Sequence, residues 1–198
     1  MQDSDPPYTE VPTENLRRWL EGLDPRDEYA SYDASELVEE LSRRPELAEY
    51  VTALLHHDQP LMRMAAVEPA TRRLRPSEAA AHARRLLDDA DGAVVAEAID
   101  VLTKTRQAPD DDQRVLDKED ASSSPVRGAV VRYVARTRLP VTREVMERRA
   151  LDASARVRQN VADELDCDEA PWAQAIRQRL RDDPDPDVRD AATDPPFG

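Results

Sequence analysis

The stretch Asp185-Pro186-Asp187-Val188-Arg189-Asp190-Ala191-Ala192, near the C-terminus, decides the fold because its pattern returns at regular intervals along the chain. Residues 154–162 carry the pattern 31 positions earlier, and residues 124–131 carry it a further 31 positions earlier. Two more copies, at residues 92–99 and 62–67, follow at spacings of 31 and 33. A fixed period of this length indicates stacked copies of one supersecondary unit.

Each copy continues with apolar residues at helical spacing. Val126, Val130 and Val134 stand at i, i+4 and i+8, which places them on one side of a helix. A polar or proline-containing turn follows, and then a second helix, which we expect at residues 78–87, about 111–116, 142–151 and 172–180. We call the first helix of each pair the A helix and the second the B helix. Such a pair buries its apolar side only against neighbouring pairs.

The sequence predicts an all-α fold, a right-handed α-solenoid of helical pairs over residues 33–198. Repeats start near residues 60, 92, 124 and 155, and a truncated one starts near residue 186. Residues 33–57 form a degenerate capping repeat, in which Asp33 is the expected N-cap of the first helix. Residues 1–32 are expected to form an N-terminal tail and a short leading helix.

Composition and charge narrow the function. The chain of 198 residues has only four Gly, against 16 Pro, which disfavours hairpins and Gly-rich phosphate loops. Its net charge of −14 makes nucleic acid or an anionic membrane an unexpected partner. The single Cys167 excludes an intrachain disulfide. Neither a signal peptide nor an apolar run of membrane length is evident, so we expect a cytoplasmic protein.

An acidic turn followed by Val-Arg-x-x-Ala or Val-Arg-x-x-Val resembles the bacterial HEAT-like repeat, the kind also found in phycobilin lyases. The acidic residues are Asp58, Asp152 and Asp182-Asp183. The resemblance covers roughly residues 33–192 and is specific for architecture, not for function. Ala96 replaces the Arg in the copy at residue 92. The resemblance implies that these arginines pair with acidic groups of a neighbouring repeat. They are Arg63, Arg127, Arg158 and Arg189. A leucine-rich variant repeat shares the pattern of residues 183–189, but its period is nearer to about 24 residues.

The sequence indicates no catalytic, metal or cofactor site, and we expect a protein that is not an enzyme. His56 and His57 are adjacent, so they point in different directions, and His82 has no second His nearby. No His-Glu pair of the kind shared by di-iron HEAT enzymes is present, and neither is a Gly-x-Ser-x-Gly motif. Several turns ahead of helices contain runs of acidic residues. We interpret these residues as helix caps, and the alternative is that a basic partner docks along them.

Arginines gather on the B helices, which by the HEAT resemblance line the concave side. We therefore predict a protein-protein interaction scaffold or adaptor whose concave face binds a protein partner. The predicted partner-binding residues are Arg84, Arg85, Arg148, Arg149 and Arg177. Three alternatives stay open: arginines that only complement helix dipoles, a nucleic-acid-binding HEAT protein using the arginine stripe, and a lyase-like chaperone subunit. HEAT-like alkylpurine DNA glycosylases are a distant possibility, since neither Trp19 nor Trp172 lies in a matching motif.

Overall fold

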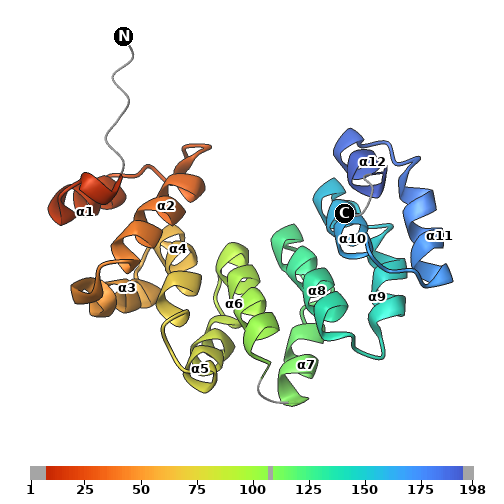
Figure 1. Cartoon of the computed structure of the whole chain (residues 1–198), viewed down its shortest axis with the longest axis horizontal. Helices are drawn as coiled ribbons and strands as arrows, with labels where there is room; N and C mark the ends of the chain where they lie inside the picture. Colours follow the sequence, from red (N-terminus) through yellow and green to blue (C-terminus); the bar gives the residue numbers. More distant parts are fainter. Residues whose placement is uncertain (1–7, 107–108, 194–198) are drawn as a thin grey trace, which may run out of the picture. The chain divides into compact units, whose positions relative to one another are not determined.

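A computed structural model describes residues 8–106 and 109–193, and over these residues the chain is helical without any β-strand (Figure 1). The all-α prediction is confirmed. In chain order the elements are η1 (Tyr8–Glu10), α1 (Thr13–Glu21), α2 (Ala30–Ser42), η2 (Pro45–Leu47), α3 (Ala48–Ala53), η3 (Leu54–His56), α4 (Pro60–Thr71), α5 (Pro76–Leu86), α6 (Gly92–Thr105), α7 (Pro109–Leu116), α8 (Ser124–Thr137), α9 (Thr142–Arg149), α10 (Ala155–Glu164), α11 (Pro171–Leu180) and α12 (Pro186–Thr193).

Two compact units make up the chain, and the boundary between them lies within α5, between His82 and Ala83. We call them unit 1 and unit 2. The predicted division at residue 32 stays a prediction. Residues 1–7 of the expected tail lie outside the described part of the chain, as do residues 194–198 of the expected array.

Unit 1 is built on α2, which packs against both α1 and α4. Leu16 and Leu20 of α1 are fully buried in this contact region. Arg44 holds the leading segment in place, because its guanidinium donates to the Thr13 hydroxyl at 2.6 Å and to the Val11 carbonyl at 2.8 Å. The short leading helix is thereby tied to the end of α2.

The predicted cap of α2 is wrong. The helix begins at Ala30, so Asp33 lies inside it. Asp27 ends the preceding loop instead, since its carboxylate accepts the backbone N–H of Tyr29 at 2.9 Å. This Asx-type turn starts the helix earlier than the sequence pattern indicated.

Unit 2 has two layers of helices (Figure 1). The A helices α6, α8, α10 and α12 pack one against the next, and the B helices α7, α9 and α11 pack beside them. The B helices begin within two residues of the predicted positions. Consecutive A helices contact each other far more extensively than consecutive B helices do. The A layer is therefore the closely packed side of this unit.

A buried residue marks the same position in the A helices α4, α6, α8, α10 and α12. The third residue of each of these helices is at most 3% exposed. These residues are Met62, Val94, Val126, Val157 and Val188. In α6 this buried residue is Val94, whereas the sequence pattern had placed it at Val95. The residue that stands where the other copies have Arg is therefore Val95, and not Ala96 as predicted. With Val94 as the equivalent residue, the spacing between successive copies is nearly constant along the sequence. The longer spacing predicted after Met62 is no longer needed.

The arginine after this buried residue forms a repeated set of bonds. Arg127 donates to the carbonyl oxygens of the preceding turn at 2.8 and 2.9 Å, and to both carboxylate oxygens of Asp152 at 2.7 Å. Arg158 donates to the carbonyl of Asp152 at 2.8 Å and to both carboxylate oxygens of Asp183 at 2.7 Å. We call the pairs Arg127–Asp152 and Arg158–Asp183 the arginine ladder. For Arg127 and Arg158 they confirm the pairing between neighbouring repeats that the resemblance implied, and for Arg63 and Arg189 that pairing stays a prediction.

Each ladder carboxylate also shapes the start of the next A helix. Asp152 accepts the backbone N–H of Ser154 at 2.9 Å, and Asp183 accepts that of Asp185 at 3.0 Å. Neither carboxylate is the N-cap of its helix, and the α10 N-cap, Ser154, makes no side-chain cap bond. The predicted capping is found at Asp91, whose carboxylate accepts the backbone N–H groups of Ala93 and Val94 at the start of α6, at 2.8 and 3.4 Å. Asp152 is 8% exposed. The bidentate bond from Arg127 lowers the pKa of Asp152 to about 2, despite the opposing effect of burial.

Side chains also connect the A helices along their length. Arg132 of α8 donates to both carboxylate oxygens of Asp100 in α6, at 3.0 and 2.5 Å. Between α8 and α10 the side chain of Asn160 lies against Gly128, where a Cβ atom would lie 2.4 Å from its amide nitrogen. A Cβ atom at this position would therefore force the Asn160 amide to move, while the backbone conformation itself does not call for glycine.

Candidate functional site

Among the arginines predicted to bind a partner, Arg84, Arg148, Arg149 and Arg177 are paired with carboxylates of the chain itself. Arg84 donates to both oxygens of Asp111 at 2.6 and 2.9 Å, and Asp111 is fully buried. Arg148 donates to both oxygens of Glu119 at 2.8 Å. These pairs connect α5 to α7 and α9 to the segment after α7, so they hold the B helices together.

The other predicted arginines are placed differently from one another. Arg149 donates to Asp152 at 3.1 Å and forms an ion pair with Asp120. Arg85 lies exposed on α5. Binding of a partner by these arginines stays a prediction, but the pairing favours a structural role for most of them. The closer packing of the A layer also does not favour the B helices as the concave side of unit 2.

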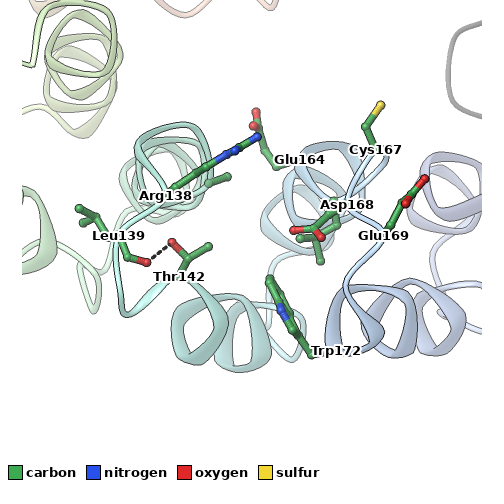
Figure 2. Close-up of a pocket in the computed structure, with 10 residues that line it drawn as sticks. Arg138, Leu139, Thr142, Glu164, Cys167, Asp168, Glu169 and Trp172 are labelled. Atoms are coloured by element: carbon green, nitrogen blue, oxygen red, sulfur yellow. Dashed lines mark hydrogen bonds between the residues drawn. The ribbon is translucent and has the colours of Figure 1, made fainter.

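A cleft of about 620 Å³ lies in unit 2, between the turn that joins α8 to α9 and the loop that joins α10 to α11 (Figure 2). Trp172 projects into it from the start of α11, with Arg138 and Glu164 across from the indole ring. We call it the Trp172 cleft. Its lining residues are Ala135, Arg138, Leu139, Thr142, Glu164, Leu165, Cys167, Asp168, Glu169 and Trp172.

The first wall of the cleft is formed by a left-handed residue. Arg138 has φ 52° and ψ 50°, a left-handed backbone conformation that residues other than Gly, Asn and Asp rarely adopt. The turn that it makes directs Leu139 inward, where it is 7% exposed. Thr142 then fixes the turn, because its hydroxyl lies 2.8 and 2.7 Å from the carbonyl oxygens of Val134 and Leu139 and can donate its proton to either. The Arg138 side chain is left exposed at the edge of the cleft.

The second wall is the loop of residues 166–169, and Arg177 positions it. The Arg177 guanidinium donates to the backbone carbonyl of Asp166 at 3.0 Å and lies 2.8 Å from its carboxylate. Asp168 accepts the backbone N–H of Ala170 at 2.9 Å and so leads the chain into α11. Arg177, predicted as a direct contact, thus shapes a wall of the cleft. A second hollow of about 470 Å³ lies on the other side of this loop.

Hydrogen-bond donors and acceptors line the cleft, and some of them have no partner among the described residues. Glu164 is held by a bidentate bond from Arg136, at 3.0 and 2.6 Å. By contrast, the guanidinium of Arg138, the carboxylate of Glu169 and the indole N–H of Trp172 make no hydrogen bond or ion pair within residues 8–106 and 109–193. The cleft therefore offers the donors of Arg138 and Trp172 beside the carboxylates of Glu164 and Asp168, whereas the Glu169 side chain points away from the indole ring (Figure 2).

Sequence reasoning did not identify the Trp172 cleft, although the period contains a signal for it. Arg138 and Glu169 are one period of unit 2 apart, the same interval that separates Val126 from Val157. Stacking therefore brings the turn after one A helix beside the loop after the next. The left-handed turn at Arg138 was not predictable, since neither Gly nor Asn stands there.

In the described part of the chain, no three His, Cys, Asp or Glu side chains come together in an arrangement that could hold a metal ion. None of the described helices has the length and apolar character needed to span a bilayer.

Comparisons with known proteins address the fold. Neither a protein-family model nor a curated protein matches the sequence. The chain is similar to an engineered protein whose crystal structure was a Northeast Structural Genomics Consortium target, with a TM-score of 0.52, 14% identity and coverage of 90% of this chain and 93% of that one. A designed armadillo repeat protein has a TM-score of 0.48 and 16% identity over 89% of this chain and 96% of its own. With the repeated A and B helices, the first likeness identifies the fold as an all-helical repeat solenoid.

Proposed function

We propose that this protein is a non-catalytic scaffold that binds an extended segment of a partner protein in the Trp172 cleft. The observation that carries the proposal is that the guanidinium of Arg138 and the indole N–H of Trp172, both unpaired within the described residues, lie at one opening with the carboxylates of Glu164 and Asp168. A peptide backbone presents carbonyl acceptors and N–H donors, which match a cleft that offers both. The indole ring adds a large apolar contact with a polar edge, a combination common in protein interfaces.

The size of the cleft sets the extent of the contact. A volume of about 620 Å³ is typical of sites for small ligands, so the cleft accommodates a few residues of a partner. The rest of the interface would extend over the neighbouring helices, because a specific interface needs roughly 800 Å² on each partner. Contacts from Arg84, Arg85, Arg148 and Arg149 would require a partner to compete with the carboxylates that already hold most of them.

Site-specific cross-linking tests this proposal, because Cys167 is the sole cysteine, is exposed and lines the cleft. A photo-reactive group attached to its sulfur reports what enters the cleft in an extract of the native cell. The captured protein is then purified and its affinity for the unlabelled scaffold is measured. Arg138→Asn removes the cation while keeping a residue that tolerates the left-handed conformation.

We expect Arg138→Asn and Trp172→Ala to weaken binding of the captured protein by about tenfold, the effect of losing one well-placed contact. Arg179→Ala is the matched control, since Arg179 is an exposed arginine of α11 outside the lining of the cleft. Melting curves verify that the variants are folded. Equal binding by Arg138→Asn, Trp172→Ala and wild type would show that the partner does not use the cleft.

A further inference from the structure

Unit 1 exposes aromatic side chains at the hairpin between α1 and α2. Trp19 is 45% exposed, Tyr29 62% and Tyr32 63%. The ring of Tyr8 packs against Trp19, with the ring centroids 6.4 Å apart. Four of the eight aromatic residues of the chain therefore lie within residues 8–32. We call Trp19, Tyr29 and Tyr32 the aromatic surface. Exposed apolar side chains gathered in one place typically mark an interaction site.

The local structure explains why these rings face solvent. α1 buries Leu16 and Leu20, and Trp19 falls outside that buried side. Tyr29 and Tyr32 are three residues apart at the start of α2, so they share one side of its first turn. The Tyr32 hydroxyl donates to Glu36 at 2.5 Å, which restricts the ring. Ordered, exposed rings lose little conformational entropy when a partner binds.

The charged residues around the aromatic surface are mostly negative. Residues 8–36 contain eight carboxylates and three arginines. None of these eight carboxylates is in an ion pair with any residue that the structure describes. With eight carboxylates against three arginines, the aromatic surface lies in a stretch of net negative charge.

We infer that the aromatic surface is a second docking surface, separate from the Trp172 cleft, and that it takes a basic segment of a partner protein. An arginine or lysine of the partner would lie over an exposed ring while its charge faces the surrounding carboxylates. Unit 1 already contains one such contact, in which the Arg17 guanidinium lies 4.2 Å from the ring centroid of Tyr50. A second copy of this chain is a poor occupant, because each copy carries a net charge of −14.

Binding of a defined peptide tests the inference. The probe is a dye-labelled peptide of three Gly-Ser-Arg units, titrated with the full chain at low ionic strength and followed by fluorescence anisotropy. The double variant Tyr29→Ser with Tyr32→Ser should bind about tenfold more weakly, because two exposed cation–π contacts are lost. Both side chains are largely exposed, so the substitutions leave the core intact.

Matched variants separate this surface from a general effect of charge. Glu28→Gln with Asp33→Asn removes two charges next to the tyrosines and should weaken binding severalfold. Asp187→Asn with Asp190→Asn removes two charges from α12, where both residues are exposed, and should change the affinity by less than about twofold. Wild-type affinity in the tyrosine variant, or equal weakening by the α12 pair, would overturn the inference. Trp172→Ala should leave peptide binding unchanged, so the two docking sites are tested independently.

Discussion

Asp152 connects the arginine ladder to the pH dependence of stability. Its pKa is lowered to about 2 in the folded protein, chiefly by Arg127, from an ordinary value of 3.8. Because the folded-state pKa is lowered, the stabilisation is complete above pH 3.8 and is lost as the pH falls toward 2. The difference corresponds to about 2 kcal/mol of unfolding free energy.

Urea unfolding at several pH values measures this contribution. We expect Asp152→Asn to be less stable than wild type at pH 7, and we expect most of that gap to close by about pH 2 as the wild-type carboxylate is protonated. Asp190→Asn is the control, because Asp190 is exposed and should give the wild-type profile. A gap of constant size from pH 7 to pH 2 would mean that the ladder does not hold Asp152 in its charged form.

At the scale of the element, the contact between α8 and α10 depends on the absence of a side chain at position 128. Gly128→Ala should destabilise the protein, because the new Cβ would lie 2.4 Å from the Asn160 amide nitrogen. In the Asn160→Ala background the same substitution should stabilise α8 by up to about 1 kcal/mol, since alanine has the higher helix propensity. A double-mutant cycle by denaturant unfolding gives the coupling energy. Additive effects of the two substitutions would contradict the close approach.

The helices could largely be predicted from the sequence, whereas the candidate site could not. Buried residues such as Val126 and Val157 recur at a fixed period, and this pattern alone locates the A helices. The Trp172 cleft depends instead on packing between repeats and on the backbone of Arg138. The sequence also shows that Arg84 and Arg148 are cations, but not that Asp111 and Glu119 lie against them. The sequence shows which residues are charged, but only the structure shows which carboxylate neutralises which arginine.

For the whole molecule, the balance of charge predicts the response to salt. The chain carries a surplus of 14 negative charges, so exposed carboxylates repel one another in the folded state. Salt screens this repulsion strongly, but it screens mostly buried pairs such as Arg158–Asp183 much less. We expect the melting temperature to rise as sodium chloride is added from about 0.01 M to 0.15 M, over which the Debye length falls from about 30 to 8 Å. A falling melting temperature, followed by circular dichroism at 222 nm, would mean that exposed ion pairs dominate.

The arginine ladder has a consequence for how the chain can change in length. Both of its pairs join an Arg to an Asp at the same separation along the sequence, and Asp152 and Asp183 are themselves one period apart. Tandem duplication of residues 152–182 would therefore give the first copy of Arg158 a new Asp152 as its partner, and the second copy would pair with Asp183. A gene encoding this protein can gain a module by one in-frame event without leaving a buried charge unpaired, and the same event in reverse would delete one.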